Sequence, residues 1–600
     1  MGDHENLPDQ IDLRDFRIEE VDGQIPFDFA RPARLLDLTV NATREFIRLI
    51  SNGLNKAGTD FRRTLEKNGV RVFDVVAEND FASVETDYGA PAKGLSFFAK
   101  PIHPTRSFRY APTRTVEGVY KTHTEQATSI AKSLIRKGYK VFDGLKEEQY
   151  PSQIHFANGG VTRAFGDVAG DLIRDFSNVN AAKKSFSHDQ GAAILVPVPT
   201  YGLFLYKLRQ LVEGHDVEIV PVRRHDNGAV DQSSLATMMC RCDEENRRII
   251  GFYDCNPQNP TGYIREKSET EDLAEILMIK NRAYIDKDLD CFEDILEEKP
   301  EISSKNDMLR TWVMSLERPQ GGMVIIDDMA YEGLEYTVQK KPYSFGQVSP
   351  EVAQRTAVLK GISKIGLPGL RTGLLVAHSE IVSPLAQTQL IDEFSASSLG
   401  VDILTARFGE KSPYRKSFSA HVRRLRKEHD RQAGVAEALF RGIDHASRLT
   451  DEEKEKLVRN YAGYAGIDPP KAKEILTEGL NPFFLEGQVD AGFFQRINCE
   501  ALANRGVYAQ FSDSDWPRPL DISHSSNLYW LFRSFGMKVV SAGQQGMPEG
   551  ALQVRITTSL PEKEMFRFYN SMRQMREYFF GPNPEYQPDL FRENVPAFKP

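Results

Sequence analysis

The sequence predicts an α/β fold built on a mostly parallel central sheet. Short apolar runs alternate with helical patterns through the middle of the chain. The candidate strands are Ile194–Val198, Val217–Val222, Arg248–Tyr253, Met323–Asp327, Thr356–Lys360 and Leu374–Ala377. Helical patterns such as Thr162–Phe176 and Gly202–Glu213 lie between them. Because this alternation is typical of sheets covered by helices on both faces, we expect ligands at the carboxyl ends of the strands.

Length and composition narrow the classes of protein. A chain of 600 residues is too long for one compact core, so it predicts two or three domains or one domain with insertions. The net charge of −9 argues against a large surface for nucleic acid or anionic membrane. Apolar runs such as Ala192–Pro199 are only strand-sized, and the acidic N-terminus has no apolar signal-peptide core. We therefore expect a soluble protein.

Cysteine usage points to a reducing compartment. The five cysteines lack paired CxxC spacing, and the histidines form no HxxxH or HExxH cluster. Neither a disulfide framework nor a metal site is indicated. A cytoplasmic location is the resulting expectation.

Two charged stretches interrupt the α/β pattern. The stretch between Gly262 and Met323 is acidic with a helical pattern, which predicts a solvated helical excursion. Residues Arg415–Gln432 are basic and have the periodicity of a long helix. For the basic stretch, a charged helix face near a domain junction is favoured over a nucleic-acid role.

Two Gly- and Pro-containing motifs occur early in the α/β region. The first, NGGVTRA from Asn158, leads into a helix. Gly160 allows close backbone approach, and the N–H groups of Val161 and Thr162 at the helix start could cradle a phosphate. The second, PVPTYG, places Tyr201 at a strand end, where it could lie flat on a planar ring, although a lone buried tyrosine is more often core.

Two further motifs follow strands. CNPQNPTG predicts a tight loop in which Asn259 could donate an amide hydrogen bond to a phenolic oxygen. MVIIDDMAY ends an apolar strand in Asp327 and Asp328, with Tyr331 three residues beyond. Buried carboxylates are costly unless they face a cation or a cleft, and a protonated pyridine nitrogen is such a cation. A helix N-cap is the structural alternative for Asp328.

The last motif is GISKIGLPGLRTG, which follows a strand. Its Gly- and Pro-rich loop brings Arg371 back towards Lys364, and an arginine can bind a phosphate through two hydrogen bonds. A lone lysine is usually a surface charge. The preceding strand–loop motifs favour a functional Lys364 instead.

These motifs, in this order over about residues 105 to 575, resemble the class I and II aminotransferases of fold type I, the aspartate-aminotransferase-like proteins. The resemblance implies pyridoxal 5′-phosphate as cofactor. It also implies a large cofactor domain over residues 115–400 and a smaller α+β domain built from residues 1–114 and 401–600. Members are commonly homodimers with amino-acid and 2-oxo-acid substrates, so neither a nucleic-acid nor a membrane partner is expected.

The resemblance implies roles around the cofactor ring. Lys364 resembles the lysine that forms the Schiff base and later shuttles the proton. Asp328 resembles the carboxylate that keeps the pyridine nitrogen protonated, and Tyr201 resembles the stacking aromatic residue. Asn259 and Tyr331 resemble the pair that hydrogen-bonds the ring 3′-oxygen.

Other implied roles concern the phosphate and the substrate. The phosphate-binding positions match Gly160, Val161, Thr162 and Arg371. Arg555, in ALQVRITTS, resembles the arginine that grips the substrate α-carboxylate, and Asn259 also matches a substrate-binding position. Tyr110 stands where the family often sends a tyrosine across a dimer interface to the partner's phosphate.

The chain departs from the family pattern at two positions. Many relatives have Ser where this chain has Gly361, so other groups must complete the phosphate site. Arg371 lies seven residues after Lys364, where eight is commoner. This shorter loop resembles the valine–pyruvate aminotransferase branch.

The expected reaction is amino-group transfer between an amino acid and a 2-oxo acid. A pyridoxal-phosphate-dependent decarboxylase or lyase, similar to aspartate β-decarboxylases, is the first alternative. The second is a catalytically silent regulatory or binding protein of the same fold. The intact NPTG and the short Lys–Arg loop favour the transferase, and the presence of Lys364 and Asp328 argues against a silent protein.

Overall fold

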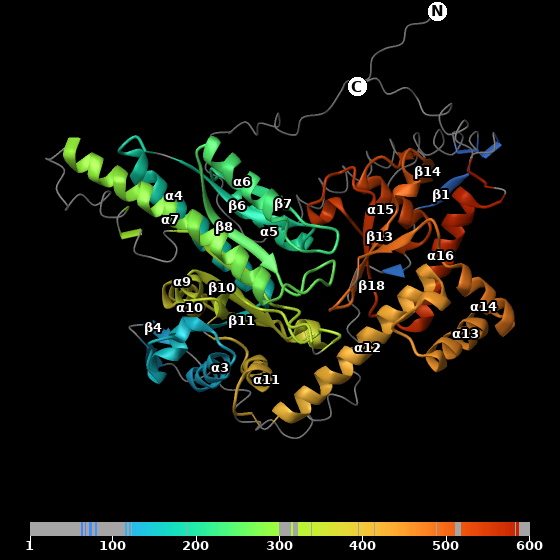
Figure 1. Ribbon diagram of the computed structural model, residues 1–600, viewed down its shortest axis with the longest axis horizontal. Helices are drawn as coiled ribbons and strands as arrows, with labels where there is room; N and C mark the ends of the chain where they lie inside the picture. The colour runs from blue at the N-terminus through green and yellow to red at the C-terminus, as the bar shows by residue number, and fades with distance from the viewer. Residues whose placement is uncertain are drawn as a thin grey trace, which may run out of the picture.

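The computed structural model describes most of the chain from residue 123 onward. It covers residues 123–586 apart from 189, 299–311, 313, 316–321, 338, 394, 413, 488, 511–517 and 583. Earlier in the chain it describes residues 62–63, 66–67, 71–74, 79–80, 114–116 and 119–121. Figure 1 shows two groups of elements, a large sheet with its helices and a second group formed mainly by the C-terminal third.

The large sheet has seven strands in the order β5-β11-β10-β9-β8-β6-β7. Their bounds are β5 (Ile154–Asn158), β6 (Gly191–Val198), β7 (Val217–Arg223), β8 (Arg247–Cys255), β9 (Val324–Asp328), β10 (Thr356–Gly361) and β11 (Thr372–Val376). Strand β11 pairs antiparallel with both of its neighbours, and the other pairings are parallel. The predicted α/β fold with a mostly parallel sheet is confirmed, and all six predicted strands are present.

Helices cover both faces of this sheet. They are α3 (Thr124–Arg136), α4 (Val161–Lys184), α5 (Gly202–Val212), α6 (Gln232–Glu244), α7 (Lys267–Glu298), α9 (Pro350–Gln354), α10 (Ser379–Asp392) and α11 (Ser398–Phe408). Successive strand side chains point to opposite faces. Ile194 accordingly packs in the core with Phe165 of α4, whereas Leu195 packs in a second core with Leu235 of α6. Apolar side chains therefore cover both faces of the large sheet and shield them from water.

Helix α7 corrects the expectation for the acidic stretch. The stretch does form a helix of 32 residues, but it is not solvated on all sides. Leu273, Ala274 and Leu277 are buried and belong to the core beneath α6. The spacing of these three residues places them on one helix face. Acidic residues dominate the composition of this stretch, so its narrow apolar stripe is difficult to recognise from the sequence.

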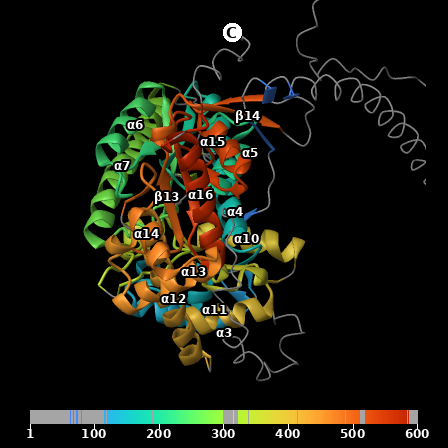
Figure 2. The same cartoon turned by 90° about the vertical axis from the view of Figure 1, so that its right-hand side faces the viewer.

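The second group contains an antiparallel sheet in the order β12-β13-β18-β17. Its strands are β12 (Phe484–Glu486), β13 (Phe494–Asn498), β18 (Gln553–Thr557) and β17 (Val540–Ser541). Its helices are α13 (Asp451–Ala465), α14 (Pro469–Glu478), α15 (Ser525–Ser534) and α16 (Glu562–Phe580). They enclose a core of their own and lie in front in Figure 2.

Short N-terminal strands pair with this C-terminal group. Strand β1 (Val72–Asp74) pairs with β14 (Gly506–Gln510), which also pairs with β15 (Arg518–Asp521). Strand β2 (Asn79–Asp80) pairs with β16 (Met537–Lys538). A separate hairpin joins β3 (Arg114–Val116) to β4 (Val119–Lys121). The domain boundaries at residues 114 and 400 stay predictions.

Helix α12 (Arg415–Arg441) is the long helix predicted for the basic stretch, and it connects the two groups. Phe418 and Leu425, in its first half, are buried in the core of the large sheet. Val435 and Leu439, near its end, are buried in the core of the C-terminal group. Among the helices that the structure describes, none combines the length and apolar character needed to cross a membrane.

A buried ionic network holds the loops at one edge of the large sheet. The Arg265 guanidinium contacts Asp254 and donates to Asp327 Oδ1 over 2.9 Å. Arg224 donates to Asp254 over 2.5 Å, and the Ser344 hydroxyl donates to Asp327 over 2.5 Å. All of these side chains are buried. Removing one partner would leave an uncompensated charge in the protein interior.

We expect Arg265→Leu to lower the free energy of unfolding by about 3–5 kcal/mol, because Asp254 and Asp327 would both lose a buried cation. Arg209→Leu, on the exposed face of α5, is the matched control and should change it by less than about 0.5 kcal/mol. Denaturant titrations of both variants measure the difference. Equal losses in the two variants would show that the network contributes nothing specific.

Candidate active site

The motif residues meet at one edge of the large sheet. Strands β10, β9, β8 and β6 are consecutive neighbours in it and run parallel. Their carboxyl ends therefore lie at the same edge, which is where ligands bind in sheets of this kind. The loops that leave these ends carry Lys364, Asp328 with Tyr331, Asn259 and Tyr201, in the same order as the strands.

Strand alternation separates the two consecutive carboxylates. Asp327 is the register partner of Asp254 and lies with it on the face that holds Arg265. Asp328 is the register partner of Cys255 and points to the opposite face, where its oxygens accept from the Ala330 N–H over 3.0 Å and the Tyr253 hydroxyl over 3.2 Å. Burial raises the pKa of Asp328 to about 6. The carboxyl is therefore largely ionised at neutral pH.

Lys364 lies in the short 3₁₀ turn Ser363–Ile365 that follows β10. Its Nζ is 5.5 Å from the ring centroid of Tyr201 and 5.3 Å from that of Tyr331. Desolvation and the nearby Arg555 lower the pKa of Lys364 to about 8, although Asp328 opposes this shift. In the part of the chain that the structure describes, its ammonium makes neither a hydrogen bond nor an ion pair. Its amine thus remains available for a ligand.

A hydrogen-bonded chain joins the second sheet to this edge. Arg555, on β18, donates from Nη1 to Asn259 Oδ1 over 3.0 Å. Asn259 in turn donates from Nδ2 to the Tyr331 hydroxyl over 2.9 Å. The Arg555 guanidinium is buried and lies 4.1 Å from the ring centroid of Phe494. Arg555 and Asn259 are separated by almost 300 residues, yet they orient each other directly.

An anion-binding geometry occurs where α4 begins. Gly160 has φ of 77° and precedes the first residue of the helix, whose initial N–H groups have no partner within the helix. Arg371 donates to the Gly159 carbonyl over 2.8 Å, so its guanidinium lies beside this helix start. A Cβ added to Gly373 would come 2.6 Å from the backbone carbon of Gly160. Glycine at position 373 thus allows β11 to lie close against the helix start.

Packing explains the departure at Gly361. A Cβ at this position would lie 2.8 Å from Cγ2 of Val161, a distance that real contacts do not show. The side chain of Val161 therefore occupies the space beside Gly361. A larger residue at position 361 would therefore have to displace the Val161 side chain.

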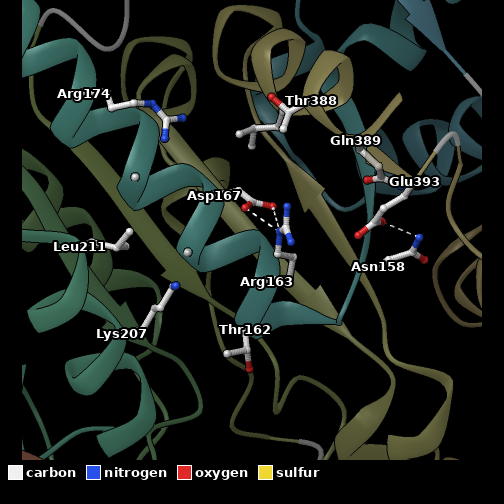
Figure 3. A pocket seen from close by; sticks show the side chains of 13 residues that line it. Asn158, Thr162, Arg163, Asp167, Arg174, Lys207, Leu211, Thr388, Gln389 and Glu393 are labelled. Atoms are coloured by element: carbon white, nitrogen blue, oxygen red, sulfur yellow. Dashed lines mark hydrogen bonds and ion pairs between the residues drawn. The ribbon is translucent and has the colours of Figure 1, made fainter. Parts of the chain in front are cut away.

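A separate cavity of about 260 Å³ lies between α4, α5 and α10 (Figure 3). The Thr162 side chain lines it, while the backbone of Thr162 belongs to the first turn of α4. Arg163 and Asp167 form an ion pair of 2.8 Å on the same helix face. Lys207 reaches towards this face from α5. Among the predicted site residues that the structure describes, Thr162 alone lines this cavity.

Tyr110 lies outside the residues that the structure describes. The other predicted site residues lie at or beside the edge described above, and their roles stay predictions.

Sequence reasoning missed three supporting residues. Tyr253 holds Asp328, Arg265 holds Asp327, and His421 of α12 places Nε2 3.0 Å from the Ile365 carbonyl, next to Lys364. None of the three lies in a motif, although the register of β8 and β9 accounts for Tyr253.

The arrangement fits pyridoxal 5′-phosphate. Lys364 is an amine without a hydrogen-bond or ion-pair partner among the described residues. A buried carboxylate, Asp328, lies close enough to influence the pKa of this amine. The start of α4 and Arg371 provide N–H groups suited to a phosphate. A parallel α/β sheet with this set at its carboxyl edge defines a protein of the fold-type-I class.

A comparison with models of known protein families supports this assignment. The family model described as aminotransferase class I and II matches residues 174–286 and 309–447. The class I and II aminotransferase family, recognised above from its motifs, is therefore confirmed for this part of the chain. A direct comparison with curated protein sequences gives no match.

Solved structures share the fold at low sequence identity. An aromatic aminotransferase from Pyrococcus horikoshii is 14% identical with a TM-score of 0.50, and the alignment covers 83% of this chain and 95% of that one. A Pyrococcus protein named protein-A1 gives the same identity and TM-score, with 86% and 95% covered. A double mutant of Thermus thermophilus aspartate aminotransferase is 13% identical with a TM-score of 0.46, with 87% and 96% covered. At these identities the first two similarities show the fold alone.

We expect the acylation of Lys364 in the cofactor-free protein to have a pH midpoint near 8, because its amine is desolvated and lies near Arg555. Mass spectrometry of the Lys364 peptide after brief acetic anhydride pulses at several pH values measures this midpoint. Arg555→Gln should raise the midpoint, whereas Arg424→Gln, at an exposed position of α12, should leave it unchanged. A wild-type midpoint above 10 would contradict the prediction.

We expect Gly361→Ala to destabilise the protein by about 1–3 kcal/mol, because the new methyl group would meet Val161. Val161→Ala in the same chain should recover much of this loss. Urea midpoints of the wild type, the two single variants and the double variant form a thermodynamic cycle. Simple additivity of the two single changes would argue against the contact.

Proposed function

We propose that this protein is a pyridoxal-phosphate-dependent aminotransferase that moves an amino group between an amino acid and a 2-oxo acid. The arrangement around Lys364 carries the proposal. Its amine lacks a hydrogen-bond or ion-pair partner among the described residues and lies within 5.5 Å of the ring centroids of Tyr201 and Tyr331. The buried Asp328 and Arg555 act on its pKa from opposite directions.

The residues present could hold each part of the cofactor. Asp328 would face the pyridine nitrogen, and Tyr331 with Asn259 would bind the ring oxygen. Tyr201 would lie against the ring. Arg371 and the first N–H groups of α4 would bind the phosphate. When bound, pyridoxal 5′-phosphate supplies an aldehyde for the substrate amine and a ring that withdraws electrons.

The polar chain from Arg555 to Tyr331 would bind and orient the substrate. A guanidinium can hold a carboxylate through two parallel hydrogen bonds. Asn259 accepts one of the N–H groups of Arg555 and so holds the guanidinium in position, and Phe494 supports its face. Burial excludes water from this ion pair and strengthens it.

Lys364 would move the proton. With a pKa of about 8, a fraction of its amine is neutral at neutral pH and can accept a proton from the substrate α-carbon. Asp328 is largely ionised in the same pH range, because its pKa of about 6 lies lower. The two groups thus have the protonation states that a base and a counter-ion require.

We further propose that two copies of the chain associate, with small molecules rather than nucleic acid or membrane as the other partners. Exposed apolar side chains support the association. Leu203 and Tyr206 on α5 are 58% and 60% exposed, and Ile391 on α10 is 83% exposed. Helices α5 and α10 flank the cavity in Figure 3. Association with a second copy would remove the apolar surface of these side chains from water.

The proposed reaction is tested with the purified protein, added pyridoxal phosphate and a panel of amino acids with 2-oxoglutarate. We expect the new amino acid to form, and borohydride to fix the cofactor on the Lys364 peptide. Lys364→Arg should lower the rate by at least about 10²-fold, because the base is lost. Lys456→Arg, at an exposed position of α13, is the control. Turnover that releases CO₂ or ammonia without any 2-oxo acid would instead show a decarboxylase or lyase.

We expect Arg555→Lys to raise KM for the amino acid about tenfold or more while changing kcat less. A lysine keeps the charge but loses the paired hydrogen bonds, which are worth about 1.5–3 kcal/mol when one group is charged. Steady-state kinetics with the preferred substrate measures both constants. An unchanged KM would mean that another residue binds the carboxylate.

A further inference from the structure

A second, larger cavity, which Lys364 does not line, lies between α11, the first half of α12 and the turn that follows β9. Its volume is about 640 Å³, within the range of small-molecule sites. Its lining combines apolar side chains with charged ones, and the charged ones are Lys137, Glu332, Glu335, Lys341, Arg407, Arg423 and Arg426. In Figure 1 the first half of α12 lies close to α11, below the large sheet.

The charges of this cavity are unbalanced. Five cationic side chains line it against two carboxylates. Glu332 is already paired with Lys137 at 3.1 Å and with the buried Lys360, and these cations lower its pKa. The other carboxylate, Glu335, accepts a hydrogen bond from the Gly333 N–H over 2.5 Å, and burial raises its pKa. The lining therefore carries an excess of positive charge.

Several of the cations have unused hydrogen-bonding capacity. In the described part of the chain, Lys341 and Arg423 make neither a hydrogen bond nor an ion pair. The Nε of Arg407 is buried without a hydrogen-bond partner among the same residues, although its Nη2 donates to the Glu332 carbonyl over 3.1 Å. Arg426 is fixed differently, since it donates to the backbone carbonyls of Glu335 and Thr337. The cavity is thus lined both by Arg426, which hydrogen bonds hold in place, and by Lys341 and Arg423, whose donors have no partner among the described residues.

We propose that this cavity binds a small organic anion with two or more carboxylate or phosphate groups. Such a ligand would supply the missing negative charge and accept hydrogen bonds from Lys341, Arg407 and Arg423. The apolar part of the lining, with Met329 and Val422, would contact its carbon skeleton. The site goes beyond the proposed reaction, because Lys364 and Arg555 do not line this cavity.

The proposal gives the basic stretch of α12 a role. Ser419, Val422, Arg423 and Arg426 lie on one face of the helix because their spacing follows the helical repeat, and this face lines the cavity. Arg424 and Lys427 are exposed and do not line it. Only one face of the basic helix is therefore available to the ligand, and the neighbouring residues provide controls.

The cavity also lies directly behind the active-site turn. Tyr331 contacts Asn259 on one side, and the next residue, Glu332, lines the cavity on the other. A bound anion would hold Lys341, Arg407 and Arg423 against the turn from Met329 to Glu335. We therefore expect binding to raise the thermal stability of the protein.

The test compares two double variants of the full-length protein by isothermal titration calorimetry with citrate and with inorganic phosphate. Lys341→Gln with Arg423→Gln removes two lining charges, and Arg424→Gln with Lys427→Gln removes two charges that lie outside. The protein is first loaded with pyridoxal phosphate and the unbound excess is removed by desalting, so that no free phosphate ester competes for the cavity. All changed positions are exposed, which protects the fold.

We expect the wild type and the outer variant to bind equally, and the lining variant to bind about tenfold more weakly or not at all. Affinity should also fall as salt is raised. Tighter binding of citrate identifies a carboxylate ligand, and tighter binding of phosphate identifies a phosphate ester. Equal affinity of the two double variants, or no binding of either anion to the wild type, would overturn the proposal. Neither outcome depends on whether the protein transfers amino groups.

Discussion

The two consecutive carboxylates at the end of β9 are the constraint on which the rest of the site depends. Alternation along the strand sends Asp327 and Asp328 to opposite faces of the sheet. Asp327 is compensated by Arg265, which extends from the segment after the Asn259 loop and so holds that loop against the sheet. Asp328 is then free to face Lys364. The end of β9 thus both holds the Asn259 loop, through Asp327 and Arg265, and places the Asp328 carboxylate in the site.

Burial gives the site its chemical character. Desolvation raises the pKa of Asp328 and lowers that of Lys364, while Arg555 and Asp328 act on the lysine in opposite directions. The same groups in water would show neither shift. The chain from Arg555 through Asn259 to Tyr331 also ties β18 of the second sheet to the large sheet. A buried hydrogen-bonded chain therefore joins the two sheets at this edge.

Local packing explains the glycine at position 361. Gly361 and Val161 share one space, so a larger residue at the helix start accompanies a smaller one at the strand end. The donors beside the start of α4 are backbone N–H groups and the Arg371 guanidinium. Gly373 likewise lies close to the backbone of Gly160, because it has no side chain.

The sequence by itself determined the α/β class, the strands of the large sheet except β5, the long helix α12 and the family motifs. These features are local, since apolar periodicity and turn residues are properties of adjacent positions. Only the tertiary structure decided that Asp327 forms an ion pair with Arg265 and that α7 buries a stripe of apolar side chains. It also decided that Val161 fills the space beside Gly361. It alone also brought Lys137, Lys341 and Arg423 around one cavity. Each of these depends on segments far apart in the chain, whose approach is set by sheet register and helix packing rather than by any local pattern.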